Sequence, residues 1–433
     1  MRENARVVAN LSVHQRSIHR SMRATRILVL GAVAVFLCAI APQLRAASTV
    51  SFASAVNYAV GMTPVAIAVD DFNADGIPDL VVVNGLSNTV SVLLGNGNGT
   101  FRTHVDYATG NGPRAVAVAD LNNDNKLDLV VANAGDNTVS VLLGNGNGTF
   151  KTHVDYATGV FPTAVAIGDL NRDTKPDIVV VNSADSTVSV LLGNGSGAFP
   201  THTDTAVGMN PHAVAVRDLN NDGNPDLIVA NTNTNNVSIL FGNGAGALQP
   251  AMNYAVGTGP SAVAVGDLNG DGNVDLAVAN TDSNNISLLF GNGNGTFQAA
   301  INDPVGTGPD GIAITDFDRS GALDLVTANA TRNTASVLIN DGRGAFPTIV
   351  TVPVGLAPAA VAVGDFNRDG WPDFAVANAN SNTVSIVLNT SVPPPAPPPR
   401  PGGALPGALP PPAPSPRPGP PMPGVPVPVP PHR

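Results

Sequence analysis

The chain has 433 residues, of which 43% are hydrophobic and only 4% aromatic, so any core is built mainly from Val, Ala, Leu and Ile. Its net charge of −11 is unevenly distributed along the chain. Residues 1–47 contain seven arginines and one glutamate, and residues 393–433 contain three arginines and no acid. Residues 48–392 contain 31 aspartates but only 11 lysines and arginines. The resulting central charge of −20 argues against nucleic acid and anionic lipid as partners, and the single cysteine, Cys38, excludes a disulfide framework.

The N-terminal region has the layout of a secretory signal. An apolar run of 15 residues at 27–41 follows Arg23 and Arg26 and precedes Ala46 and Ala47. This order predicts a signal peptide over residues 1–47, with Met22 as an alternative start that gives a signal of ordinary length. A membrane-spanning helix needs about 20 residues, so we expect no stable membrane span after cleavage, the alternative being an uncleaved signal anchor. The expected location is secreted, periplasmic or cell-surface.

Residues 48–392 repeat one unit every 49 residues. In the second copy the unit consists of Gly110-x-x-Pro113, an expected strand at Ala115–Ala119, an acidic loop at 120–128, expected strands at Leu129–Asn133 and Thr138–Leu143, a hairpin turn at Gly144–Gly148 and a last strand at Phe150–Ala157. The runs are short, β-branched and free of helical periodicity. Four antiparallel strands at this period are typical of a propeller blade, so we predict an all-β, seven-bladed β-propeller with the Ala-rich first strand innermost.

The two ends of the repeat region predict how the ring closes. The seventh copy ends at Asn389 without a fourth strand, whereas an unmatched strand at Phe52–Val60 precedes the first copy. Phe52 and Tyr58 in this strand match Phe101 and Tyr107 in the next copy. We expect the N-terminal strand to complete the last blade, because two sheet edges would otherwise stay open. The expected product is a monomeric propeller.

Residues 393–433 form a proline-rich tail. The segment has 21 prolines in 41 positions, so it cannot build a packed core. We predict a disordered tail rich in polyproline II conformation.

Each repeat contains a nine-residue acidic loop with oxygen-bearing side chains at positions 1, 3, 5 and 9 and usually glycine at position 6. Ca²⁺ takes six to eight hard oxygen ligands in flexible geometry, and glycine permits the positive φ that lets the chain wrap an ion. Seven matches in fixed register therefore predict up to seven Ca²⁺ ions, one per blade. The predicted ligands are Asp71, Asn73, Asp75, Asp79, Asp120, Asn122, Asp124, Asp128, Asp169, Asn171, Asp173, Asp177, Asp218, Asn220, Asp222, Asp226, Asp267, Asn269, Asp271, Asp275, Asp316, Asp318, Ser320, Asp324, Asp365, Asn367, Asp369 and Asp373.

The seven loops differ in quality. The second has Asn125 at the glycine position, which asparagine tolerates, and the third has the β-branched Thr174 there. The sixth has Ser320 in place of an aspartate. We predict that the third site is the weakest or the most distorted.

These loops, together with the looser Leu-Leu-Gly-Asn-Gly-Asn-Gly-Thr-Phe segments at 93–101 and 142–150 and Phe290-Gly291, carry a family resemblance. The chain resembles FG-GAP/VCBS repeat proteins, whose relatives include the N-terminal propellers of integrin α subunits, over residues 48–392. The resemblance implies a seven-bladed propeller with Ca²⁺ between the first and second strands of the blades, and roles in adhesion and ligand binding.

Other polar and aromatic residues mostly follow the repeat. His104, His153 and His202 occupy equivalent positions, which favours structural roles over a metal or catalytic cluster. The tyrosines are also in register, and we expect them to pack on the outer strands, with sugar stacking as the alternative. The residues that break register are Phe161, Arg217, Asp310, Arg332 and Trp371. Trp371 is expected to be exposed at the rim of the metal loops.

No local, asymmetric catalytic set stands out, so we do not expect an enzyme. The leading hypothesis is a secreted calcium-binding propeller that acts as a non-catalytic binding or adhesion module for proteins or extracellular matrix. A lectin-like propeller that binds glycans or polysaccharides is the alternative, and an enzyme that uses the mouth of the central channel is the third.

Overall fold

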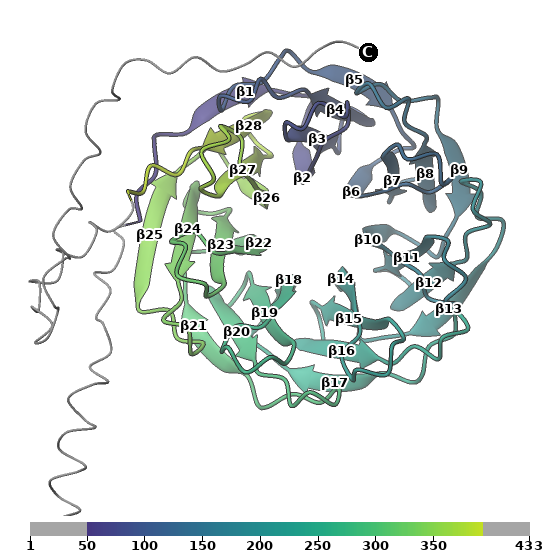
Figure 1. Cartoon of the computed structure of the whole chain (residues 1–433). Coiled ribbons are helices and arrows are strands. Elements are labelled where there is room, and N and C mark those ends of the chain that lie inside the picture. The colour runs from purple at the N-terminus through teal and green to yellow at the C-terminus, as the bar shows by residue number, and fades with distance from the viewer. Residues whose placement is uncertain (1–49, 393–433) are drawn as a thin grey trace, which may run out of the picture. The chain divides into compact units, whose positions relative to one another are not determined.

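The computed structural model describes residues 50–392, which form seven four-stranded antiparallel sheets arranged as blades around a central channel (Figure 1). The predicted all-β, seven-bladed propeller is therefore confirmed. The predicted signal peptide, the alternative start at Met22 and the proline-rich tail lie outside the described residues. Among the described residues, no helix is long and apolar enough to cross a membrane.

Each blade contributes one strand to each of four concentric positions (Figure 1). The innermost strands all begin at a proline and are β2 (Pro64–Asp70), β6 (Pro113–Ala119), β10 (Pro162–Gly168), β14 (Pro211–Arg217), β18 (Pro260–Gly266), β22 (Pro309–Thr315) and β26 (Pro358–Gly364). The second strands all run from an aspartate to an asparagine and are β3 (Asp79–Asn84), β7 (Asp128–Asn133), β11 (Asp177–Asn182), β15 (Asp226–Asn231), β19 (Asp275–Asn280), β23 (Asp324–Asn329) and β27 (Asp373–Asn378).

The two outer positions follow in the same order. The third strands are β4 (Thr89–Leu93), β8 (Thr138–Leu142), β12 (Thr187–Leu191), β16 (Asn236–Leu240), β20 (Asn285–Leu289), β24 (Thr334–Ile339) and β28 (Thr383–Val387). The outermost strands are β5 (Val105–Ala108), β9 (Val154–Ala157), β13 (His202–Ala206), β17 (Met252–Ala255), β21 (Ile301–Pro304), β25 (Thr348–Pro353) and, for the last blade, β1 (Val56–Ala59).

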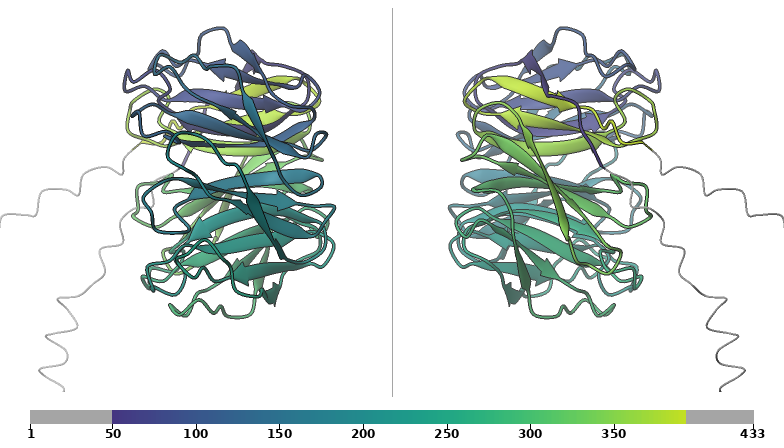
Figure 2. Two further views of the ribbon diagram at one scale, coloured as in Figure 1. Left: turned by 90° about the vertical axis from the view of Figure 1, so that its right-hand side faces the viewer. Right: turned by 90° about the vertical axis from the view of Figure 1, so that its left-hand side faces the viewer.

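The outermost strand is shorter than predicted. In the second blade it covers Val154–Ala157 rather than Phe150–Ala157, and Phe150 instead makes a separate bridge to Gly144. The buried ring of Phe150 packs against Tyr107 at 5.5 Å, so this residue anchors the turn to the neighbouring blade. Figure 2 shows the strands of successive blades stacked around the ring in side view.

The ring closes as predicted. Strand β1 pairs antiparallel with β28, with Val56 opposite Ile386, and Phe52 bridges to Asn389. The ring of Phe52 then meets Phe317 at 5.7 Å and Phe374 at 5.3 Å. The N-terminal strand thus covers the edge of the last blade and is held there by aromatic packing as well as by the strand ladder.

The hydrophobic core lies between blades rather than within one. All residues of the second strands are fully buried, and they form seven clusters that each join neighbouring blades. In one cluster, for example, Val130 of β7 packs with Ile178 and Val180 of β11. Burying both faces of these Val- and Leu-rich strands is what joins the seven sheets into one ring.

A β-bulge interrupts every innermost strand just after its proline. In β6, Pro113 pairs with Asn133 and Ala115 with Ala132, which leaves Arg114 without a partner. The same shift recurs in all seven blades. A bulge bends the strand and re-aims one side chain. Each blade therefore presents one extra residue at this end of its innermost strand.

Candidate metal centres and the channel mouth

The ninth-position aspartate ties each acidic loop to its blade. Asp79, the first residue of β3, is fully buried, and its carboxylate accepts hydrogen bonds from the amides of Phe72 (3.1 Å) and Gly95 (2.7 Å). The equivalent aspartate does the same in every blade, and all seven are fully buried. One carboxylate thus fixes both the acidic loop and the hairpin turn that follows the third strand of the blade.

The other oxygen-bearing side chains close the loop on itself. In the first loop, Asp71 accepts from the amides of Asp75 (3.1 Å) and Gly76 (2.7 Å), Asn73 accepts from Asp75 (2.9 Å), and Asp75 accepts from Ile77 (2.9 Å). These side chains therefore sit on one tight turn between the first and second strands of the blade. All 28 predicted ligands occupy this turn or the first residue of the second strand.

Two residues of each loop adopt positive φ. The predicted position 6 does so in every copy, including Asn125 (61°) and Thr174 (66°). Position 4 also does so throughout, although only the fifth loop has glycine there. Arg319, for example, has a φ of 55°. The requirement at position 4 was missed by the sequence analysis, because arginine and alanine, which occupy this position in four of the seven loops, do not signal a left-handed residue.

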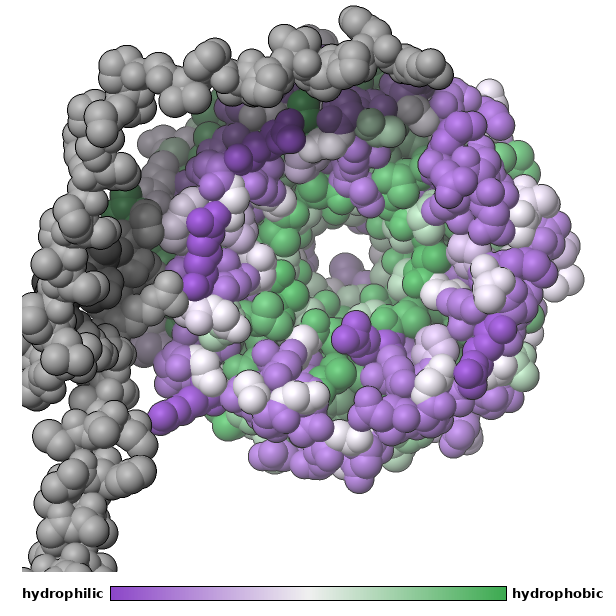
Figure 3. Space-filling model, in the orientation of Figure 1, coloured by the Kyte–Doolittle hydropathy of each residue, from purple (hydrophilic) through white to green (hydrophobic). Residues whose placement is uncertain are grey.

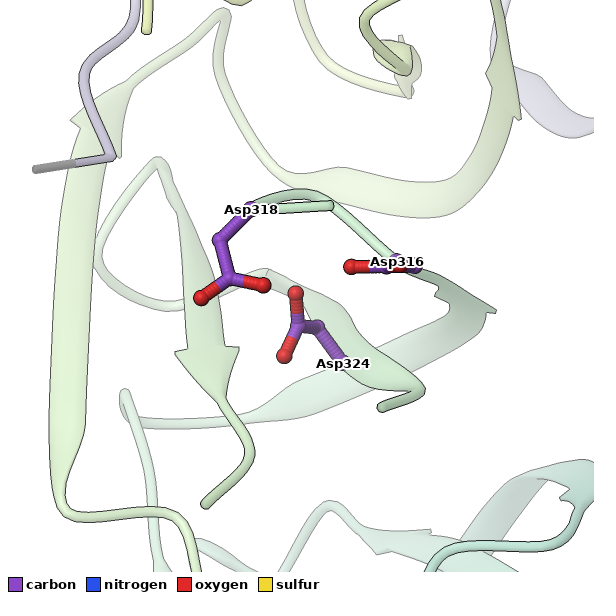
Figure 4. A group of neighbouring side chains, drawn as sticks. All are labelled: Asp316, Asp318 and Asp324. Atoms are coloured by element: carbon purple, nitrogen blue, oxygen red, sulfur yellow. The ribbon is translucent and has the colours of Figure 1, made fainter. Parts of the chain in front are cut away.

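Three carboxylates converge in the sixth loop. The oxygens of Asp316, Asp318 and Asp324 that could bind a metal lie within 4.8 Å of one another, and Figure 4 shows the three side chains turned toward a common space. This loop has aspartate where the others have asparagine at position 3. Its side chains offer only oxygen atoms, the ligand type that hard divalent cations prefer.

Burial makes these carboxylates costly to ionise. It raises the pKa of Asp79 to about 6 and the pKa values of Asp324 and Asp373 to about 7, against the opposing effect of the backbone amides that bond them. Neighbouring aspartates of the same loop add to the rise. A bound cation would offset both the burial and the repulsion.

The fourth loop contains an unpartnered oxygen. Asp218 Oδ1 is buried and has no hydrogen-bond partner among the described residues, while its Oδ2 accepts from the amide of Gly223 (2.9 Å). A buried carboxylate oxygen without a donor is costly unless a cation or water meets it. The unpartnered oxygen therefore indicates a metal site in the fourth loop, and this observation is independent of the convergence of carboxylates in the sixth loop.

In the second and third loops a lysine occupies part of the site. Lys126 Nζ lies 3.1 Å from Asp124 Oδ2, and Lys175 Nζ lies 3.1 Å from Asp173 Oδ2. The hydrogen bond from Lys175 lowers the pKa of Asp173. Because an ammonium group already neutralises the charge of this carboxylate, the binding of a metal cation is less favourable in these two loops.

Trp371 is buried, which contradicts the expected exposure at the rim of the loops. Only 8% of its surface is accessible, and the guanidinium carbon of Arg319 lies 4.3 Å from the centre of its ring. Arg319 is at position 4 of the sixth loop and reaches position 7 of the seventh. Arg172 makes the corresponding reach to Asn224, with 3.4 Å between Nη1 and Oδ1. Neighbouring loops therefore touch one another, which the sequence pattern alone did not show.

The in-register histidines and tyrosines have structural partners. His153 Nδ1 lies 2.8 Å from Oδ1 of Asp155, a residue of β9, and His104 and His202 face the equivalent aspartates. The four tyrosines each meet a phenylalanine edge-on, with ring centres 5.5 to 5.7 Å apart. The predicted packing of the tyrosines is confirmed, and each histidine stays with its own blade.

The seven bulge residues meet around one mouth of the central channel. They line a cavity of about 520 Å³ and are Val65, Arg114, Thr163, His212, Ser261, Asp310 and Ala359. Of the residues that break register, Asp310 and Phe161 line this cavity. Arg217 lies at the far end of its innermost strand, and Arg332 is exposed in a turn.

The channel mouth contains Ser, His and Asp, but they are not arranged as a nucleophilic triad. His212 Nδ1 lies 3.3 Å from the backbone carbonyl of Ser261, so it is the protonated nitrogen and donates. The Ser261 hydroxyl donates to the carbonyl of Pro309 (3.1 Å) instead of to His212. In this arrangement the Ser261 hydroxyl is not hydrogen-bonded to His212, as it would be in a nucleophile–base pair.

The sequence profile of the FG-GAP-like repeat matches six overlapping segments of the chain, at residues 71–131, 120–180, 169–229, 218–278, 267–327 and 316–376. Each match begins at the first aspartate of an acidic loop, and the last ends beyond the seventh loop. The chain belongs to the FG-GAP-like repeat family. The resemblance to FG-GAP repeat proteins inferred from the loops is confirmed.

Solved structures share the fold of this FG-GAP-like protein at low identity. BBS1N in complex with ARL6DN matches with 13% identity and a TM-score of 0.56, covering 79% of this chain and 97% of that one. A catalytically inactive virginiamycin B lyase from Staphylococcus aureus matches with 13% identity and a TM-score of 0.54, covering 78% and 99%. The periplasmic gluconolactonase of Pseudomonas aeruginosa matches with 16% identity and a TM-score of 0.55, covering 68% and 86%. No curated protein matches the sequence.

The sequence analysis named the channel mouth only as the site of a third, enzymatic hypothesis, and it missed the ring of bulge residues there, although a signal for the ring exists. The residue after Gly-x-x-Pro differs in all seven copies, whereas the next residue is alanine in six of them and glycine in one. Comparing copies at this single position would have pointed to a site.

Proposed function

We propose that this FG-GAP-like propeller binds Ca²⁺ in its acidic loops and acts as a secreted, non-catalytic binding or adhesion module for proteins or extracellular matrix. The observation that carries the calcium proposal is the convergence of Asp316, Asp318 and Asp324 within 4.8 Å. Three carboxylates this close repel one another unless protons or a cation intervene. Ca²⁺ suits the loops because it accepts many oxygen ligands in irregular geometry.

In this proposal calcium has a structural role. Each loop joins the innermost strand to the fully buried second strand, and its ninth-position aspartate also bonds the turn after the third strand. A cation held there would fix three strand ends of the blade at once. Calcium supplies charge compensation, and the chain supplies the orientation of its carboxylates through the amide hydrogen bonds described above.

The adhesion role rests on the secretion signal expected from the sequence, on the family and on the extended surface of the ring. Figure 3 shows hydrophilic residues over most of one face and hydrophobic residues around the channel opening. The strongly acidic repeat region favours partners that carry basic groups or accept calcium-bridged contacts.

Calcium content and capture of a partner test the proposal together. The purified protein is dialysed free of metal, and calcium binding is counted by titration calorimetry and elemental analysis. We expect up to seven ions, with the second and third loops filling last because of Lys126 and Lys175. Capture of extracellular matrix proteins on immobilised protein should need calcium. Absence of saturable calcium binding would refute the calcium part, and absence of any captured protein would refute the adhesion part.

A glycan ligand is the second candidate, favoured by a groove between the fourth and fifth blades. The groove has a volume of about 380 Å³ and is lined by an aromatic side chain, Tyr254, and by the amides Gln298 and Asn302. Such a mixture of ring and amide groups suits sugars. A glycan array with and without EDTA distinguishes the candidates: binding to glycans that is lost in Y254A supports the lectin, and no binding leaves protein adhesion.

A further inference from the structure

The residue at the bulge of each innermost strand varies more than its surroundings. From the first blade to the seventh it is Val, Arg, Thr, His, Ser, Asp and Ala, while the residue that follows it is small in every blade. Packing does not explain this variety, because neighbouring positions in the same strands repeat closely. All seven residues line one cavity, so the variation produces an asymmetric ring of side chains on a symmetric scaffold.

This cavity lies at the opposite end of the innermost strands from the acidic loops. Each strand starts at the proline before the bulge and ends where the acidic loop begins, which is seven residues later in β6. Seven residues of strand extend over roughly 20 Å. The ring is therefore separate from the proposed calcium sites. Its volume of about 520 Å³ falls in the ordinary range for small-molecule pockets.

Three charged or titratable groups in this ring keep hydrogen-bonding capacity for a ligand. The guanidinium of Arg114 stacks over Phe161, 5.8 Å from the ring centre, and donates no hydrogen bond to a described residue. His212 donates from Nδ1 to the carbonyl of Ser261, so in the neutral imidazole its Nε2 is an acceptor. The half-buried carboxyl group of Asp310 accepts no hydrogen bond from a described residue.

The hydroxyls in the ring have a different task. Thr163 donates to the carbonyl of Pro211 at 3.1 Å, and Ser261 donates to Pro309 at 3.1 Å. Each of these bonds joins a bulge to the innermost strand of the next blade. The hydroxyls thus hold the mouth in shape, and their oxygens keep lone pairs that can accept a hydrogen bond.

We propose that this channel mouth binds a small polyhydroxylated carboxylate, such as a free sugar acid. A guanidinium is the preferred partner of a planar carboxylate, which it can hold through two parallel hydrogen bonds. Asp310 and His212 Nε2 are acceptors, so they suit the hydroxyl groups at the other end of the molecule. The apolar wall of Val165, Val214 and Ile312 suits the carbon skeleton. This site is additional to the proposed calcium-dependent adhesion.

The test is titration of the full chain, in calcium, with glucuronate as the probe and glucose and propionate as comparisons. Glucose lacks the carboxylate and propionate lacks the hydroxyls. We expect saturable binding of glucuronate that is at least about tenfold tighter than that of either comparison, since a hydrogen bond to a charged group is commonly worth this factor.

The chain itself supplies variants that keep the fold. R114V copies the first blade and D310A copies the seventh, so each introduces a residue that the same bulge already accommodates. R217Q is the matched control, because Arg217 is an exposed arginine at the other end of an innermost strand. R114V should weaken glucuronate binding at least about tenfold, D310A should weaken it by a similar factor, and R217Q should leave it unchanged.

Three results would overturn the proposal. The first is the absence of saturable glucuronate binding to a protein that is folded by circular dichroism. The second is glucuronate binding that survives both R114V and D310A. The third is binding of glucose with the same affinity as glucuronate. Because every titration is done in calcium on folded protein, failure here leaves the calcium and adhesion proposal standing.

Discussion

The hydroxyl of Thr327 donates to Oδ1 of Asn329 at 3.0 Å, a bond that only one blade of the seven described contains. In each of the other six blades the equivalent asparagine oxygen is buried and has no partner among the described residues. The reason is a single difference in sequence, because those blades have valine where the sixth blade has Thr327. Six buried acceptors thus lack the donor that the sixth blade supplies.

A hydroxyl should be tolerated at Val82, the equivalent of Thr327 in the first blade, and should be destabilising at the neighbouring Val81. We predict that V82T leaves the free energy of unfolding nearly unchanged, because the new hydroxyl can donate to Asn84 Oδ1. V81T buries a hydroxyl at a neighbouring, fully buried position and should cost about 1–3 kcal/mol. Urea unfolding of both variants measures the difference, and equal losses would contradict this account of the asparagines.

The contact between Arg319 and Trp371 makes the only tryptophan a reporter of the loops. We predict that R319A exposes the indole, shifts its emission to longer wavelength and increases quenching by acrylamide. R172A is the control, because Arg172 has the same loop position but reaches Asn224 instead. An unchanged emission in R319A would show that the arginine does not shield the ring.

Thr174 should be strained in its loop. Its φ of 66° is left-handed, which costs a β-branched residue about 1 kcal/mol or more. We predict that T174G raises the free energy of unfolding by about 1 kcal/mol. N125G, at the equivalent position of the second loop, should gain less because asparagine tolerates this conformation. Denaturant unfolding compares the two, and a greater gain from N125G would contradict the ranking of the third loop as the most distorted.

The metal-free protein should lose stability as pH rises from 5 to 8. Burial raises the pKa values of Asp79, Asp324 and Asp373 to about 6 or 7, well above the unfolded value of 3.8. Groups with raised pKa values stabilise the fold fully below the unfolded value, and this contribution is lost as pH passes through the folded value. Unfolding in EDTA across this range measures the slope, and stability that increases with pH would contradict it.

Calcium should remove most of this pH dependence, because a bound cation favours the ionised carboxylates. Aspartates whose pKa values are lowered from the ordinary value, such as Asp173, do not interfere, since they stay ionised over this pH range. The same experiment in calcium is therefore the control.

Much of this molecule could be predicted from its sequence because the repeat displays each rule seven times. Strand order, closure by the N-terminal strand and the position of the acidic loops all follow from short periodic patterns. Contacts between blades could not be predicted in this way. The contact between Arg319 and the ring of Trp371 depends on the distance between neighbouring loops, which no repeat pattern gives. The ring of bulge residues that includes Arg114 and Asp310 depends on β-bulges that cannot be recognised in a single repeat.

The most direct test of the central claim is the midpoint of thermal unfolding of the metal-free protein with and without calcium. A ligand that binds only the native state stabilises it by about 2.7 kcal/mol per site at one hundred times its dissociation constant. Several loops acting together predict a large rise in the midpoint on addition of calcium, and a return to the lower value in excess EDTA. An identical midpoint in calcium and in EDTA would contradict the proposal that these loops are calcium sites.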